Sequence, residues 1–130
     1  MTIAPQAYLL AHDASTKSLN NYMKIGSITI EDNVFIGARA LIMPGVTIGK
    51  NSIVAAGSIV TKSIPEGSIA AGNPAKIIST IENYITKSNE LMDGAKVYDH
   101  SYTIGGNGNI SSLNKVKMYE DLINEIGLVI

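Results

Sequence analysis

The chain has 130 residues, a formal net charge of −1 and no cysteine; 45% of it is hydrophobic, whereas only 5% is aromatic. This length fits one domain, or one domain with a tail, and the near-neutral charge gives no reason to expect a nucleic-acid or anionic-membrane partner. The lack of cysteine excludes disulfides, thiol catalysis and cysteine-ligated zinc. No apolar run reaches the roughly 20 residues of a membrane-spanning helix, and residues 1–10 lack the charged start of a signal peptide. We therefore expect a cytoplasmic protein without membrane insertion.

A six-residue spacing is present at the start of the chain. Ile3 and Leu9 lie six positions apart, and the small residue Ala7 occupies the fourth place of that hexad. A period of six fits neither the 3.6-residue period of a helix nor the two-residue period of an ordinary strand. We therefore expect a structural repeat that begins at or before residue 3.

Residues 12–27 interrupt this spacing with a polar stretch. A polar insert between two in-phase parts of a repeat predicts a loop that leaves one corner of the structure. Long ordered loops are more often functional than not. His12 stands where the repeat gives way to this loop, and Asp13 follows it.

From residue 30 to residue 64 the repeat is continuous and has two columns, the first branched aliphatic and the second small or β-branched. The first column is Ile30, Ile36, Ile42, Ile48, Val54 and Val60, and the second is Val34, Ala40, Val46, Ser52, Ser58 and Ile64. Short hexapeptide repeats of this kind predict a parallel β-helix with three flat sides. Gly37, Gly45, Gly49 and Gly57 fall where corners are expected, and glycine suits positions that need unusual backbone angles.

The repeat is expected to end at Pro65, with a last partial coil over residues 68–76. From about Ser79 the pattern becomes helical, and Gly94 is a plausible stop for this helix. The sequence thus predicts a β-helix domain over residues 1–78, with its loop at 12–27.

The remaining segment, residues 79–130, is predicted to be a helical extension. Residues 97–109 are expected to be extended, and Ser111 or Ser112 to cap a second helix that ends at Gly127. The apolar faces of these helices are too large to leave in water, so we expect them to cover the end of the repeat or a neighbouring subunit.

Four blocks that follow His12 resemble the hexapeptide-repeat acyltransferases, in particular the maltose, galactoside and polysaccharide O-acetyltransferase branch. In order, they are Asn33-Val-Phe-Ile-Gly-Ala38, Pro44-Gly-Val-Thr-Ile-Gly49, Ala56-Gly-Ser-Ile-Val-Thr-Lys62-Ser-Ile-Pro65 and Ala71-Gly-Asn-Pro-Ala-Lys76. The resemblance covers about residues 3–78. It implies a left-handed parallel β-helix, a homotrimer of prisms side by side, and acetyl-CoA as co-substrate in the groove between neighbouring prisms. A contact that repeats around a closed ring would also give a trimer on physical grounds.

The resemblance assigns catalytic roles to two residues. His12 matches the general base that deprotonates the acceptor hydroxyl, and a neutral imidazole suits this role near neutral pH. Taken without the family, a histidine at this place more often caps a corner of the coil. The backbone N–H of Ala38 matches the donor that faces the thioester oxygen, a contact commonly worth ~3 kcal/mol in such reactions.

The resemblance also assigns the acetyl-CoA contacts. Ala56 matches a backbone contact to the pantetheine arm, Thr61 and Lys62 match positions near the pantetheine and phosphates, and Lys76 matches a cation near the nucleotide phosphates. Lysine binds phosphate as a point charge, although exposed lysines are common for other reasons.

The acceptor side is less closely matched. Asp13 is expected to belong to the acceptor site or the loop, because adjacent residues of an extended segment point to opposite sides; Tyr22 and Lys24 are further candidates for acceptor contacts. Phe35 stands where the branch usually has Trp. Relatives usually carry further coils before the histidine, so the acceptor pocket is expected to be incomplete or different.

These observations favour an O-acetyltransferase that acts on a sugar or polysaccharide precursor. An N-acyltransferase on an amino or nucleotide sugar, which would use the same base and donor groove, and a non-catalytic structural β-helix remain open. A zinc-dependent carbonic anhydrase of the same fold needs three histidine ligands, whereas this chain has only His12 and His100. We therefore expect no metal, and we expect His100 to lie at the surface.

Overall fold

The computed structural model describes residues 1–103 and 109–130, and the chain forms two compact units, Met1–Tyr84 and Ile85–Ile130. The boundary between the two units falls after Tyr84, slightly later in the chain than the boundary after residue 78 that the sequence predicts. That functional division stays a prediction.

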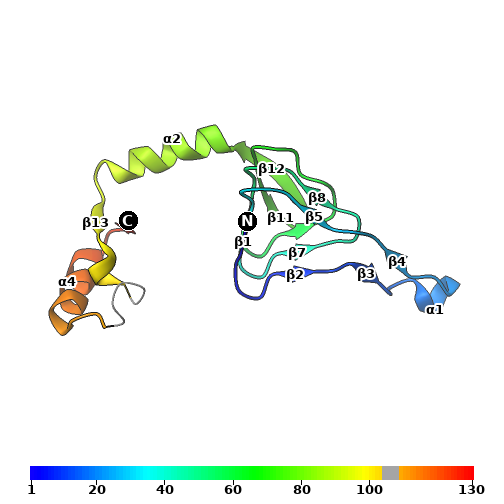
Figure 1. Cartoon of the computed structure of the whole chain (residues 1–130), viewed down its shortest axis with the longest axis horizontal. Helices are drawn as coiled ribbons and strands as arrows, with labels where there is room; N and C mark the ends of the chain where they lie inside the picture. The colour runs from blue at the N-terminus through cyan, green and yellow to red at the C-terminus, as the bar shows by residue number, and fades with distance from the viewer. Residues whose placement is uncertain (104–108) are drawn as a thin grey trace. The chain divides into compact units, whose positions relative to one another are not determined.

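The first unit is a parallel β-helix whose two-residue strands stack along three sides (Figure 1). The first side contains β1 (Thr2–Ile3), β6 (Phe35–Ile36), β9 (Ile53–Val54) and β11 (Ser68–Gly72); the second contains β2 (Tyr8–Leu9), β7 (Leu41–Ile42) and β10 (Ile59–Val60). The third contains β5 (Thr29–Ile30), β8 (Thr47–Ile48) and a bridge from Ile48 to Ile64. The expected left-handed parallel β-helix with a helical C-terminal extension is confirmed.

Three corners join these sides, and we name them by their place in each coil. The first corner, residues 37–40 and 55–58, leads from the first side to the second. The second corner, residues 43–46 and 61–63, leads to the third side, and the third corner, residues 31–34 and 49–52, leads back to the first.

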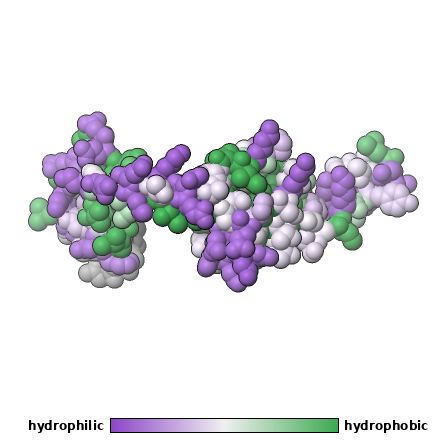
Figure 2. All heavy atoms as spheres, turned by 90° about the horizontal axis from the view of Figure 1, so that it is seen from above, coloured by the Kyte–Doolittle hydropathy of each residue, from purple (hydrophilic) through white to green (hydrophobic). Residues whose placement is uncertain are grey.

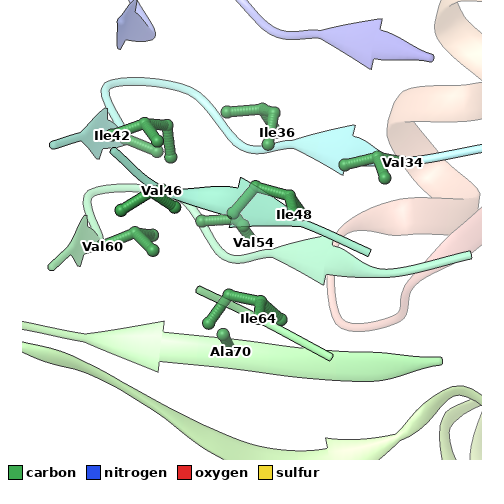
Figure 3. Packing of buried hydrophobic residues seen from close by; sticks show 10 residues of the cluster. Val34, Ile36, Ile42, Val46, Ile48, Val54, Val60, Ile64 and Ala70 are labelled. Carbon is green, nitrogen blue, oxygen red and sulfur yellow. The ribbon is translucent and has the colours of Figure 1, made fainter. Parts of the chain in front are cut away.

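The two columns of the repeat form the core, as the sequence predicts (Figure 3). The aliphatic column is fully buried from Ile36 to Val60, and every member of the second column is at most 5% exposed. In the first coil the equivalent Ile3 pairs with Ile36 and is 41% exposed.

The corner glycines divide into two kinds, and the sequence-based explanation holds for one of them. Gly45 and Gly57 have φ values of 82° and 70°, which glycine adopts readily. Gly37 and Gly49 do not; a Cβ on Gly37 would lie 2.4 Å from the backbone nitrogen of Ala56. The explanation by backbone angle is therefore wrong for these two, where close approach of the next coil excludes a side chain.

Residues 12–27 form a hairpin that projects from the β-helix, with β3 (His12–Asp13), α1 (Lys17–Asn20) and β4 (Lys24–Ile25) (Figure 1). Ile36 pairs with Val54, 18 positions away, whereas Ile3 pairs with Ile36, 33 positions away, so the insert adds 15 residues to the first coil. Hydrophobic side chains are visible on its surface (Figure 2), where Leu19 is 84% exposed.

The last coil differs from the expected partial coil. β11 stacks in parallel on β9, but the chain then reverses at Asn73-Pro74, and β12 (Ala75–Thr80) pairs antiparallel with β11. The prediction over residues 68–76 is therefore wrong beyond Gly72. α2 (Ile81–Met92) follows directly and ends two residues before Gly94.

The second unit contains most of α2, from Ile85 onward, and then β13 (Lys96–Tyr98), the 3-10 turn η1 (His100–Tyr102), α4 (Ser112–Leu122) and β14 (Gly127–Val129). β13 and β14 pair in parallel, and the Ser111 hydroxyl caps α4 by accepting the Asn114 N–H, as expected. The expected helix end at Gly127 is wrong, because Gly127 opens β14. The extended segment expected at 97–109 is a strand only to Tyr98, turns at η1, and lies partly outside the described residues.

Candidate active site

His12 lies where the hairpin leaves the second corner. The Leu10 N–H donates to the Ile42 carbonyl, so the chain enters the hairpin beside Met43, and the Gly26 N–H donates to Ala11 on its return. His12 pairs with Ile25 across the hairpin, and its side chain is exposed. An exposed imidazole at this place is accessible to an incoming acceptor.

Asp13 is half-buried and its carboxylate is locally fixed. Its Oδ1 accepts the Ser15 N–H at 2.9 Å, and this bond, with the Ser15 hydroxyl and the charge of Lys24, lowers the pKa of Asp13. No hydrogen bond joins Asp13 to His12 in the part of the chain that the structure describes. Asp13 is thus an ionised acceptor of hydrogen bonds and does not orient the imidazole.

A hollow of about 480 Å³ lies between the hairpin and the second corner. Six residues line it: Asp13, Lys24, Ile25, Met43, Pro44 and Thr61. Three of them are apolar and three are polar or charged. This mixture suits a small polar molecule that also has an apolar face, because apolar walls with a few placed polar groups are usual for ligand sites.

Tyr22 lies apart from this hollow. Its side chain is 74% exposed, and its backbone is tied to the hairpin tip, where its carbonyl accepts the Thr16 hydroxyl at 2.9 Å. The structure therefore does not bring Tyr22 together with Asp13 and Lys24.

Ala38 and Ala56 lie in successive coils at the first corner. The Gly57 N–H donates to the Ala38 carbonyl at 2.8 Å, which holds the two coils in register. Ala38 is half-buried and Ala56 is exposed. Among the described residues the Ala38 N–H has no hydrogen-bond acceptor, so it is available to one from outside the chain.

The candidate phosphate-binding lysines are both exposed but lie at different corners. Lys62 follows Thr61 at the second corner. Lys76 lies on β12 opposite Ala71, just after the turn whose Gly72 N–H donates to Ser58 of the first corner. The exposed ammonium groups can both reach a ligand in solution.

The predicted site residues thus form two groups on one prism. At the second corner Asp13, Lys24 and Thr61 line the hollow, whereas His12 and Lys62 stand next to them in the chain and do not line it. Ala38, Ala56 and Lys76 follow the first corner, and Tyr22 belongs to neither group. The second side of the prism, with β2, β7 and β10, separates them. One copy of the chain therefore does not bring His12 and Ala38 to the same reacting atoms.

Some residues of the site were not singled out from the sequence. Ile25, Met43 and Pro44 line the hollow, and Arg39 stands directly after Ala38 at the first corner. The sequence predicts only a corner at Pro44. The hollow arises because the returning strand of the hairpin, with Lys24 and Ile25, lies beside this corner. Within the described ranges no group of three or more potential metal ligands gathers, and no helix there is long and apolar enough to cross a membrane.

Comparison with known proteins now identifies the repeat. Residues 27–62 match the sequence family described as the hexapeptide repeat of succinyl-transferase. The chain carries the repeat of the hexapeptide acyltransferases. It is 50% identical over 64 residues to the 2,3,4,5-tetrahydropyridine-2,6-dicarboxylate N-acetyltransferase of Clostridium perfringens, a match that covers 49% of this chain and 27% of that protein.

Two solved structures of this hexapeptide-repeat type are similar to the chain. A galactoside acetyltransferase in complex with coenzyme A has a TM-score of 0.59 and 40% identity, covering 65% of this chain and 44% of that one. A maltose O-acetyltransferase from Clostridium difficile 630 has a TM-score of 0.55 and 37% identity, covering 60% and 43%. In each comparison the chain spans less than half of the other protein.

Proposed function

We propose that this hexapeptide-repeat protein is an acetyl-CoA-dependent O-acetyltransferase whose acceptor is the hydroxyl of a sugar or polysaccharide precursor. The observation that carries the proposal is the free N–H of Ala38 at one corner and the exposed His12 at another. A homotrimer of prisms would place the first corner of one copy against the second corner of the next. The donor, acetyl-CoA, fits a cytoplasmic enzyme.

In this site the neutral imidazole of His12 takes the proton of the acceptor hydroxyl. The oxygen attacks the thioester carbonyl carbon, and the Ala38 N–H of the adjacent copy stabilises the negative charge on the carbonyl oxygen. The carbon–sulfur bond then breaks, the acetyl group stays on the acceptor, and the imidazolium returns its proton to the departing thiolate.

The remaining predicted residues bind the two substrates. Ala56 leaves room for the pantetheine arm, and Lys76 of the same copy binds phosphate beyond it. Thr61 and Lys62, at the second corner of the adjacent copy, border the same groove. The hollow at the second corner takes the acceptor: Asp13 accepts its hydroxyl groups and Ile25 covers an apolar face.

An N-acetyltransferase is the second candidate. The relative of Clostridium perfringens that is 50% identical over the repeat carries that activity in its name. The same base and the same N–H donor serve an amine acceptor, so the two reactions differ only in the acceptor group.

The first experiment measures thiol release from acetyl-CoA with a panel of hydroxyl and amino sugars. We expect release that requires an added acceptor and that falls by about 10²–10⁴-fold in His12→Ala. If acetyl-CoA does not bind to the wild-type protein, the proposal is wrong and a structural β-helix replaces it.

The position of the site between copies has its own test. His12→Ala and Ala56→Trp, which blocks the first corner at an exposed position, are each expected to be inactive. Refolded mixtures of the two would regain activity up to about a quarter of the wild-type value, because random pairing around a closed ring leaves that share of interfaces intact. Mixtures that remain inactive, although mixed trimers form, would place the whole site in one copy.

A further inference from the structure

Arg39, the single arginine of the sequence, has an unusual position beside the proposed thioester site. It lies at the first corner, directly after Ala38, with a φ of 59°. This left-handed region is uncommon for residues other than glycine, asparagine and aspartate. The equivalent place one coil later is taken by Gly57, so the corner itself does not require an arginine.

The guanidinium group of Arg39 is held toward the first coil. Its Nε donates to Oε1 of Gln6 at 2.7 Å, and its backbone N–H donates to the Pro5 carbonyl at 3.3 Å. Gln6 and Pro5 belong to the coil that precedes Ala38. The side chain therefore lies on the opposite side of Ala38 from Ala56 and Lys76, which belong to later coils.

No carboxylate of the described residues neutralises the charge of Arg39. The residue is exposed, and in the part of the chain that the structure describes no carboxylate lies within ion-pair distance of it. Since Nε is bound to Gln6, the two terminal nitrogens remain as donors. Together they form the planar fork that binds a carboxylate or a phosphate through two hydrogen bonds.

We propose that Arg39 is a specificity-determining residue that selects acceptors bearing a carboxylate or phosphate group. The inference rests on the proposed transferase, in which pantetheine runs from Ala38 past Ala56 toward Lys76. The nucleotide phosphates then lie beyond the later coils, and the guanidinium lies on the other side of the thioester, toward the first coil. The hairpin that forms the acceptor hollow also leaves this first coil, and in the proposed trimer the hollow belongs to the adjacent copy. Tethering by Gln6 reduces the freedom that the side chain loses on binding.

The test compares the binding of three probes that differ in one group: methyl galactoside, methyl galacturonide and galactose 6-phosphate. Their dissociation constants are measured by calorimetry or by NMR titration, in the presence of coenzyme A. We expect the wild-type protein to bind at least one acidic probe about ten-fold more tightly than the neutral one, since hydrogen bonds to charged groups are worth about this factor or more. The two acidic probes show whether the preferred anion is a carboxylate or a phosphate.

The decisive variant is Arg39→Gly, because glycine accepts the left-handed backbone and preserves the corner. It should abolish the preference for the acidic probe, whereas Lys50→Ala, which removes an exposed charge at the third corner, should retain it. A wild-type protein without the preference, or a preference that survives Arg39→Gly, overturns the proposal. Binding is measured without turnover, so a failure of acetyl transfer with intact acidic preference would instead overturn the proposed function.

Discussion

The buried hydroxyl of Ser52 lies 3.2 Å from the backbone nitrogen of Ser68 and accepts its N–H. The same hydroxyl donates to the Pro65 carbonyl at 2.9 Å. Ser52 is fully buried in the second column, where Val34 and Val46 stand in the same column. Ser52 thus carries a hydroxyl where the valines of this column carry a methyl group. Its hydrogen bonds join residue 52 to Pro65 and to Ser68, the first residue of β11.

Replacing Ser52 with alanine should therefore destabilise the β-helix by about 1–3 kcal/mol, because the Ser68 N–H and the Pro65 carbonyl lose a partner in a buried place. Urea denaturation followed by circular dichroism measures this change. Ser27→Ala, at an exposed serine, is the matched control and should leave the midpoint unchanged. Equal midpoints for all three proteins would contradict a stabilising role of the Ser52 hydroxyl.

Alanine substitutions at two corner glycines should destabilise the β-helix by different amounts and for different reasons. In Gly37→Ala the new methyl would lie 2.4 Å from the Ala56 nitrogen, so the two coils must separate, and the β-helix should be strongly destabilised. Gly57→Ala meets no atom within 4 Å and is strained only by its φ of 70°, which costs roughly 1–2 kcal/mol. Thermal unfolding of both variants ranks them, and a less stable Gly57→Ala would contradict the packing explanation.

Removal of His12 should affect catalysis and leave the fold intact, because its side chain is exposed and no side-chain bond of it is described. Under the proposed mechanism His12→Ala lowers kcat by about 10²–10⁴-fold, the usual contribution of a general base. Acetyl-CoA affinity should not change. His100→Ala, at an exposed residue of the second unit, serves as the control. An equal decrease of kcat in that variant would contradict a specific catalytic role of His12.

The carboxyl group of Asp13 should titrate below its usual range. The Ser15 N–H, and then the Ser15 hydroxyl and Lys24, stabilise the ionised form and lower its pKa. Because the folded pKa is lower than the unfolded one, this contribution to hairpin stability is complete above the unfolded pKa, near 3.8. It is lost as the pH falls through the folded pKa.

NMR titration of the Asp13 carboxyl carbon tests this directly. Ser15→Pro removes the N–H donor and should return the pKa toward 3.8. If the wild-type carboxyl already titrates at 3.8, the Asp13–Ser15 bond does not persist in solution.

The fold of the first unit was predictable because its sequence signal is local and repeated. Each aliphatic residue of the column from Ile36 to Val60 faces the same interior, so a fixed period of six suffices to predict the core. The polar break at 12–27 likewise indicated a projecting segment. The reversal at Asn73-Pro74 was not predictable in this way. By its sequence, the segment 68–76 fits a further coil, and only the antiparallel pairing of β12 with β11 shows that the chain turns back.

The sequence by itself determined which residues are buried, where the repeat is interrupted, and which histidine stands beside the interruption. Only the tertiary structure decided how these residues are grouped in space. His12 and Ala38 lie at different corners because the chain passes along the third and first sides between them, which is less than a full turn. Gly37 is small because another coil passes against it. These relationships arise between residues of successive coils, and a period along the chain carries no information about the distance between stacked backbones.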